Sequence, residues 1–116
     1  MADSDPDCLF CRIVGGEVPA DRVAEDDQVI VFRDINPRAP THVLAIPRRH
    51  VPSAADLTDA DGDLLAALFG ALRRVAEQAG LRGYRIVTNV GPESGQSVLH
   101  LHFHLLGGRS MTWPPG

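Results

Sequence analysis

Three histidines that alternate with apolar residues, His100, His102 and His104, constrain this chain more than any other feature. Successive side chains of an extended strand point to opposite faces, so we expect a strand over residues 98–106 with the three imidazoles on one face. Same-face neighbours lie roughly 6.5–7 Å apart, which lets adjacent rings share one phosphate group or metal ion. The opposite, buried face is predicted to hold the intervening apolar residues, Leu99, Leu101, Phe103 and Leu105.

Short strands and one long helix are predicted over the rest of the chain. Apolar and β-branched stretches predict strands near residues 23–25, 28–33, 41–47 and 84–89. Leucines at helical spacing predict a helix over residues 58–79, which begins with a capping box formed by Thr58 and Asp61. A short helical turn is expected over residues 8–14. This order indicates an α+β fold, in which the long helix covers one side of an antiparallel sheet.

Length and charge limit what the chain does. At 116 residues we expect one domain over residues 8–116, preceded by a flexible tail at residues 1–7. The net charge of -4 and the lack of a basic stripe argue against a nucleic acid polymer as a partner. No apolar run approaches the ~20 residues of a membrane span, and the acidic start lacks the features of a signal peptide. We therefore expect a cytoplasmic protein that does not associate with membranes.

The two cysteines, Cys8 and Cys11, are separated by two residues. In a cytoplasmic chain this spacing indicates a metal half-site or a redox pair rather than a structural disulfide. A thioredoxin-like redox pair lies between a strand and a helix, whereas no strand is predicted before Cys8. A metal site would need two further ligands from elsewhere in the chain.

The histidine run also resembles a known family signature. Residues 100–106 match the pattern His-φ-His-φ-His-φ-φ, where φ is apolar, of the histidine-triad family of nucleotide hydrolases and transferases. Further segments are similar to the Hint branch of that family, the purine nucleoside phosphoramidases. These segments are residues 34–37, 39–42, 95–98, 107–109 and 113–116, and the likeness extends from Cys8 to the end of the chain.

The resemblance implies a homodimer in which two five-stranded antiparallel sheets join into one ten-stranded sheet, each subunit having a long helix and a short N-terminal helix. It also implies hydrolysis of purine nucleoside 5′-phosphoramidates and aminoacyl-adenylates to the nucleoside monophosphate. In similar enzymes a histidine attacks the α-phosphorus, forms a covalent nucleotidyl-histidine and is then freed by water. An uncharged imidazole is nucleophilic near neutral pH, which agrees with this chemistry.

The family pattern implies catalytic roles for four residues, His102, His104, His42 and Ser97. His102, the middle member of the run, is the expected nucleophile, with its second ring nitrogen bonded to a backbone carbonyl. His104 is expected to contact the phosphate and His42 to orient the rings from another strand, with a packed, half-buried His42 as the alternative. Ser97 offers a hydroxyl to phosphate oxygens or to the leaving group.

Nucleotide binding is implied for a wider set around these residues. Asp34 is expected to accept hydrogen bonds from ribose hydroxyls, Ile35 to cover a purine face, and Asn89 to offer its amide to phosphate or ribose. Glycine in the segment 95–97 permits close approach of backbone N–H groups to a phosphate. The full set is Asp34, Ile35, Asn89, Gly95, Gln96, Ser97, His102, Phe103 and His104.

A structural zinc site is the expectation for the cysteine pair, with Cys8, Cys11, His50 and His100 as ligands. Two thiolates and two imidazoles satisfy the tetrahedral preference of Zn²⁺. Bacterial relatives with this N-terminal pair look similar and carry a structural zinc. Many Hint members lack the cysteines, so zinc is not expected to be required for catalysis. The alternative is two reduced cysteines that pack as small apolar side chains.

Three other functions stay open from the sequence. A zinc hydrolase would use histidine ligands and a metal-bound water, and would lose activity with a chelator. A dinucleoside polyphosphate hydrolase uses the same triad on a larger leaving group, although the ending at residues 113–116 favours the phosphoramidase branch. A non-catalytic nucleotide-binding scaffold is the third alternative.

Overall fold

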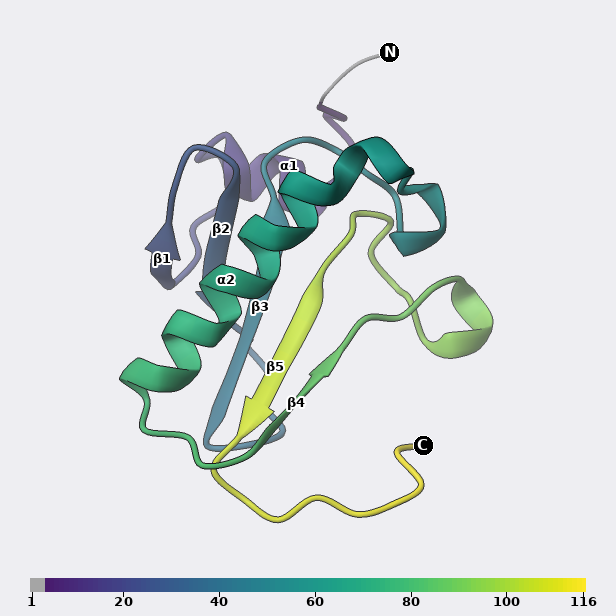
Figure 1. Cartoon of the computed structure of the whole chain (residues 1–116). Coiled ribbons are helices and arrows are strands. Elements are labelled where there is room, and N and C mark those ends of the chain that lie inside the picture. The colour runs from purple at the N-terminus through teal and green to yellow at the C-terminus, as the bar shows by residue number, and fades with distance from the viewer. Residues whose placement is uncertain (1–3) are drawn as a thin grey trace.

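Five antiparallel strands form one open sheet at the centre of the computed structural model, which describes residues 4–116 (Figure 1). The strands are β1 Arg22–Glu25, β2 Val29–Arg33, β3 Thr41–Pro47, β4 Tyr84–Val87 and β5 Phe103–Gly107. Their order across the sheet is β1-β2-β3-β5-β4, so β3 and β5 are neighbours in the interior while β1 and β4 are the edges. This is the five-stranded α+β fold that the sequence predicts.

Two helices pack on opposite faces of this sheet, α2 in front of it in Figure 1 and α1 behind. α1 is Leu9–Val14 and α2 is Gly62–Gln78, with 3-10 turns at Ala54–Asp56, Asp59–Asp61 and Pro92–Ser94. The predicted capping box of Thr58 and Asp61 is present, but it starts a 3-10 turn, and the α-helix itself begins at Gly62. Among residues 4–116, no helix is long and apolar enough to cross a membrane.

Each face of the sheet carries its own apolar core, because the strand residues alternate. On β2, Val29 and Val31 join the core beneath α2. Ile30 and Phe32 join the second core, beneath α1. The leucines predicted for the long helix supply the first core, and they are Leu64, Leu68 and Leu72. The prediction of one covered side was therefore incomplete, since α1 covers part of the other.

The histidine strand is shorter than predicted. β5 begins at Phe103 rather than at position 98. Its partner β3 ends at Pro47, which has no N–H to donate to a longer ladder. Leu101 instead donates its N–H to the carbonyl of Val51 at 2.6 Å. Residues 98–102 therefore approach the sheet as an irregular segment, which corrects the predicted strand over residues 98–106.

Although the strand is shorter than predicted, side chains of the histidine run still alternate between the two faces of the sheet. The imidazoles of His102 and His104 lie on the same side, with ring centroids 5.2 Å apart. Three intervening residues are buried beneath α2 as predicted, and they are Leu101, Phe103 and Leu105. Leu99 is also predicted to be buried, but its side chain is 63% exposed because it precedes the point where the segment joins the sheet.

The chain before α1 is bonded to the cysteine pair. The predicted tail covers residues 1–7, of which residues 1–3 lie outside the described residues. Asp5 donates its N–H to Cys11 Sγ at 3.4 Å, and the Asp5 carbonyl accepts the N–H of Cys8 at 3.0 Å. These bonds connect the segment just before α1 to both cysteines.

Candidate active site and candidate metal centre

The ring orientation of His102 is imposed by its own chain. Its Nδ1 lies 2.7 Å from the carbonyl oxygen of His100, and because a carbonyl only accepts, Nδ1 carries the proton. The neutral ring then has its lone pair on Nε2. Thr88, which follows β4, donates its hydroxyl to the His102 carbonyl at 2.8 Å and anchors the same residue. The unprotonated nitrogen is therefore available to attack an electrophile.

The sheet register brings His42 and His104 together. Leu44 of β3 lies opposite His104 of β5, and His42 is two residues away on the same face. Diagonal neighbours of this kind are within reach of ring side chains. Asp34 follows β2, and its Oδ2 lies 3.4 Å from His42 Nε2 and 3.9 Å from His104 Nδ1. Side chains from three neighbouring strands or strand ends thus converge at one place.

A chain of hydrogen bonds sets the tautomer of His104. The backbone N–H of Arg38 donates to His42 Nδ1 at 3.0 Å, so the neutral His42 ring carries its proton on Nε2. That Nε2 lies 2.9 Å from His104 Nδ1 and donates to it. His104 therefore carries its own proton on Nε2, where it can be donated to an anionic ligand. The sequence predicts that His42 orients the other rings. An orienting role requires a hydrogen bond to one of them, such as this bond from His42 to His104.

Both of these imidazoles are neutral at neutral pH. The pKa of His104 is lowered to about 4, chiefly by burial and to a smaller extent by the nearby rings of His102 and His42, while the carboxylate of Asp34 opposes the shift. Burial also lowers the pKa of His42, although the carboxylate of Asp34 opposes that shift. Asp34, His42 and His104 form a group of potential metal ligands, but the imidazole–imidazole hydrogen bond already uses two of the nitrogens that would bind the ion.

A cleft of about 370 Å³ opens beside His102 and His104. Three other predicted site residues also line it, the polar Asp34 and Ser97 and the apolar Ile35. Its opposite wall is apolar and is formed mainly by Phe10, Ile13, Val18, Ala20, Phe32 and Leu44. The volume is in the range of small-molecule sites, and this combination suits a flat aromatic ring joined to a group with hydroxyls and negative charge.

The loop before the histidine run contributes less to the cleft than the sequence predicts. Gly95 and Gln96 donate their backbone N–H groups to carbonyls within the loop. The buried side chain of Gln96 is also committed to three backbone groups of the same region. Of residues 95–97, Ser97 alone lines the cleft.

Two further predicted binding residues lie away from the cleft wall. Asn89 follows β4 and is half-buried, but it does not line the cleft. Phe103 points to the other face of the sheet, where its ring centroid lies 5.2 Å from that of Phe69 on α2. The side chain of Phe103 thus supports the core beneath α2 rather than the cleft.

Phe10 and Thr88 both contact His102, and the sequence predicts neither contact. The Phe10 ring meets the His102 ring edge to face, with centroids 5.1 Å apart and an interplanar angle of 88°. One phenylalanine and one threonine carry no motif by themselves. In the sequence Phe10 stands between Cys8 and Cys11. That position predicts that it lies near the candidate metal ligands, and it does not predict a contact with His102.

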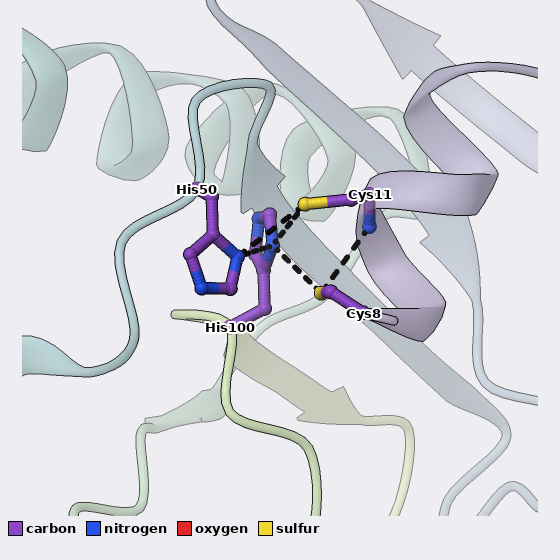
Figure 2. A group of neighbouring side chains, drawn as sticks. All are labelled: Cys8, Cys11, His50 and His100. Atoms are coloured by element: carbon purple, nitrogen blue, oxygen red, sulfur yellow. Dashed lines mark hydrogen bonds between the residues drawn. The ribbon is translucent and has the colours of Figure 1, made fainter. Parts of the chain in front are cut away.

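The predicted metal ligands come together from three parts of the chain, as Figure 2 shows. Cys8 and Cys11 belong to the start of α1, His50 follows β3, and His100 precedes β5. One donor atom from each lies within 4.8 Å of all the others. Both cysteines are free and buried, and such convergence on two imidazoles goes beyond the packing of two small apolar side chains.

The distances in this cluster fit a tetrahedral zinc ion. Bond lengths of about 2.3 Å to sulfur and 2.0–2.1 Å to nitrogen imply edges of about 3.6 Å between S and N and about 3.3 Å between two nitrogens. His100 Nδ1 lies 3.3 Å from Cys8 Sγ, 3.5 Å from Cys11 Sγ and 3.3 Å from His50 Nδ1. Cys11 Sγ lies 3.3 Å from His50 Nδ1.

Hydrogen bonds around the cluster prepare the donors. His100 Nε2 lies 2.8 Å from the carbonyl oxygen of Pro47 and must donate to it, which leaves the Nδ1 lone pair free for a metal ion. The Cys8 sulfur accepts the N–H of Cys11 at 3.3 Å. Burial raises the pKa of the Cys8 thiol, so a buried thiolate here needs a cation beside it. The cluster is therefore compatible with a structural zinc site.

The ligand count bears on the metal-hydrolase alternative. A catalytic zinc usually keeps one position for water or substrate, whereas a structural zinc has four protein ligands. Cys8, Cys11, His50 and His100 supply all four. None of the four lines the cleft beside His102. A zinc-bound water therefore has neither a coordination position nor a route to a substrate in that cleft.

Comparisons with known proteins find relatives over nearly the whole chain. The HIT domain family model matches residues 15–111. An uncharacterised HIT-like protein of Synechococcus elongatus is 48% identical over 111 residues, covering 95% of this chain and 97% of its own. A 14 kDa zinc-binding protein of Zea mays is 46% identical over 115 residues, covering 97% of this chain and 90% of its own.

Solved structures give the same result. A HIT family hydrolase from Legionella pneumophila Philadelphia 1 superposes with a TM-score of 0.93 at 51% identity, covering 95% of this chain and 100% of the other. A histidine triad protein from Clostridium difficile superposes with a TM-score of 0.90 at 38% identity, covering 94% and 96% of the two chains. The likeness therefore extends over nearly the whole length of both chains.

Proposed function

The chain belongs to the HIT domain family, and on that premise we propose that it is a nucleotide-binding hydrolase of the Hint branch. Its proposed substrates are purine nucleoside 5′-phosphoramidates and aminoacyl-adenylates, which it converts to the nucleoside monophosphate. The observation that carries this proposal is the 2.7 Å bond from His102 Nδ1–H to the His100 carbonyl, because it leaves the Nε2 lone pair at the cleft. Neighbours named as HIT family hydrolases support a hydrolytic reaction.

In the first step His102 Nε2 attacks the α-phosphorus of the bound substrate. A new N–P bond forms to the imidazole, and the P–N bond to the amine breaks, with the leaving amine taking a proton. His104 donates its Nε2–H to a phosphate oxygen and stabilises the charge that develops there. Ser97 lines the cleft and offers its hydroxyl to the phosphate or to the leaving group. The product of this step is the free amine and a nucleotidyl-His102.

In the second step water attacks the phosphorus of the nucleotidyl-histidine. The bond from phosphorus to His102 Nε2 breaks, the nucleoside monophosphate leaves, and the neutral imidazole returns. The bond from His102 Nδ1–H to the His100 carbonyl persists through both steps, and it stabilises the positive charge on the ring while phosphorus is attached. For a phosphoramidate the sum of the two steps is hydrolysis of one P–N bond, and the proton that the amine takes is balanced by the one that water releases. For an aminoacyl-adenylate the same steps break the P–O bond to the carboxylate, which leaves in place of the amine.

The nucleoside is proposed to occupy the rest of the cleft. A purine fits the apolar wall formed in part by Phe10, Ile13 and Phe32. Ile35 is fully exposed at the cleft and is available to cover the other face of the base. Asp34, also at the cleft, is available to accept hydrogen bonds from ribose hydroxyls.

Contacts from the neighbouring loops are proposed as well. The Asn89 amide is assigned to the ribose or phosphate, which it would reach from outside the cleft wall. Gly95 and Gln96 are proposed to hold the backbone of that loop in place, because their N–H groups are already bonded within it. Phe103 is assigned a role through its backbone position between His102 and His104, since its ring faces the opposite core.

A homodimer with a ten-stranded sheet is also proposed, formed through β4. The β1 edge is interrupted by a bulge between Arg22 and Ala24, a feature that discourages pairing. At the β4 edge, Tyr84 is 41% exposed, and Phe69, which packs on the adjoining β5, is 44% exposed. Trp113 is exposed and is proposed to reach toward the site of the second subunit.

The cysteine cluster is proposed to hold structural zinc. The name of the maize relative, a 14 kDa zinc-binding protein, supports this proposal. Two buried, free thiols that act as ligands belong in a reducing compartment, which supports the expected cytoplasmic location.

Substrate specificity tests the proposal. Parent protein and a His102→Ala variant are compared on adenosine 5′-phosphoramidate and on a diadenosine polyphosphate, with release of adenosine monophosphate measured for each. We expect turnover of the phosphoramidate by the parent and a loss of about 10³-fold or more in the variant. Faster turnover of the dinucleotide would instead support the dinucleoside polyphosphate hydrolase. Binding of adenosine monophosphate without turnover of either compound would support a non-catalytic scaffold.

A further inference from the structure

His100 belongs to both sites at once. Its Nδ1 is one of the four donors of the cluster, and its backbone carbonyl accepts the Nδ1–H of His102 at 2.7 Å. The imidazole of His100 is fully buried, and its Nε2 is held by the Pro47 carbonyl. A displacement of this side chain therefore moves the carbonyl that determines the tautomer of His102.

Phe10 makes a second connection between the two sites. It lies between two ligands of the cluster, because Cys11 follows it directly and Cys8 stands two positions before it. Its ring meets the His102 ring with centroids 5.1 Å apart, and the His100 ring with centroids 5.8 Å apart. The packing surface of the His102 ring is thus supplied by the same short helix that supplies two ligands.

The sheet does little to hold this part of the chain. β5 starts at Phe103, one residue after His102, so the segment that carries His100 and His102 has no strand partner. Apart from the cluster, it is held by the buried Leu101 side chain and by three single hydrogen bonds, from the Leu101 N–H to Val51, from His100 Nε2 to Pro47 and from the Thr88 hydroxyl to the His102 carbonyl. An irregular segment held by few bonds depends strongly on each remaining tie.

We propose that the Cys8–Cys11–His50–His100 cluster positions the nucleophile: when a metal ion joins these side chains, the His100 carbonyl and the Phe10 ring are held where they keep His102 in its attacking tautomer. This inference rests on the proposed function only for its effect on rate. It assigns to the cluster a role in catalysis that the expectation of a purely structural zinc leaves out. His100 is here a positioning residue, since it acts through His102 and does not touch the reacting atoms.

A His100→Gln variant separates the two bonds of that side chain. The Gln amide can donate to the Pro47 carbonyl as His100 Nε2 does, but it has no donor atom in the place of Nδ1. The variant keeps the backbone carbonyl, and Cys8, Cys11 and His50 remain to bind a metal ion. Parent protein, metal-stripped parent and the variant are compared with an Ile46→Val control, which removes one methyl group from the core that holds Phe10 and both cysteines but leaves every donor atom and every cleft-lining residue in place.

The first readout is the single-turnover rate of nucleotidyl-His102 formation from adenosine 5′-phosphoramidate. We expect the rate to fall about ten- to hundredfold in metal-stripped parent and in His100→Gln, with little change in the half-saturating substrate concentration. Stripping metal from the variant should cost less than stripping the parent, because the tie through His100 is already broken and only the tie through α1 and Phe10 remains. Zinc or cadmium added to stripped parent should restore the rate, since the metal ion only joins the four side chains and takes no part in the reaction. A parental rate in folded, metal-stripped protein or in His100→Gln overturns the proposal.

The second readout does not depend on activity. Nitrogen-15 chemical shifts of the His102 ring report its tautomer directly, measured at a mildly alkaline pH. We expect one tautomer, protonated at Nδ1, in metal-loaded parent and in the Ile46→Val control, and a mixture in His100→Gln. The same single tautomer in the variant contradicts the proposal, even if the parent turns over no phosphoramidate. If stripped parent unfolds, the comparison of His100→Gln with loaded parent decides the matter by itself.

Discussion

Acid should destabilise this protein through His104 in particular. Its pKa is lowered to about 4 in the folded chain, chiefly by burial, whereas an unfolded histidine titrates near 6.5. Between these values the unfolded chain binds a proton that the folded chain does not. The free energy of unfolding is therefore complete above the unfolded pKa and falls as the pH drops through this window.

The size of the effect follows from the two pKa values. Each unit of difference corresponds to about 1.4 kcal/mol, so lowering the pH through the whole window removes about 3 kcal/mol. At pH 5, where the unfolded ring is almost fully protonated and the folded ring is mostly neutral, the loss is about 2 kcal/mol. The side chain of His104 is 20% exposed, so solvent screening reduces these values only modestly.

Urea denaturation at pH 7.5 and pH 5 measures this loss, with His104→Gln as the matched variant. Gln keeps a hydrogen-bonding side chain but does not titrate, and His42 and His100 are present in both proteins, so their contributions largely cancel. We expect the parent to lose about 2 kcal/mol more than the variant between the two pH values. Equal losses in both proteins would refute the assignment of a neutral, buried His104.

Three other predictions address the metal, the phosphate contact and the core. Parent purified without added zinc should contain about one zinc ion per chain, and the Cys8→Ser/Cys11→Ser double variant should contain almost none; a variant with parental zinc by metal analysis would disprove the ligand set. Ser97→Ala should lower the turnover of a phosphoramidate about tenfold or more with an unchanged circular dichroism spectrum, and unchanged kinetics would exclude the hydroxyl. Leu68→Ala should lower the free energy of unfolding by about 2–5 kcal/mol, because Leu68 is fully buried beneath α2. A loss below about 1 kcal/mol in urea would contradict that packing.

The fold could be predicted from the sequence because its elements carry local signals. The β-branched residues of β2 alternate with a period of two, and the leucines of α2 recur with a period of 3.6 residues. Each pattern places its apolar side chains in the core, as the structure shows. The start of β5 could not be predicted, since it depends on where another strand ends. Pro47 limits the ladder of β3, and this constraint on Leu99 and His100 lies more than fifty positions away in the chain.

Part of the candidate site could likewise be predicted from the sequence, and part depends on tertiary contacts. His42 and His104 converge because register between β3 and β5 brings their side chains to one face, and His102, just before β5, keeps the alternation that the histidine run predicts. The commitments of Gln96 and the orientation of Phe103 follow from tertiary contacts, with the loop and with Phe69, and have no local signal. The contact of Phe10 with His102 depends on how α1 docks, so it too required the three-dimensional structure.

Detection of a covalent intermediate on His102 is the most direct test of the proposed chemistry. Parent protein is mixed rapidly with adenosine 5′-phosphoramidate, quenched without acid because a phosphorus–imidazole bond is acid-labile, and measured as intact mass and as peptides. We predict an added adenylyl group on the peptide that contains His102, and no such group in His102→Ala. Turnover by the parent without any adduct, or an adduct on a different residue, would contradict nucleophilic attack by His102.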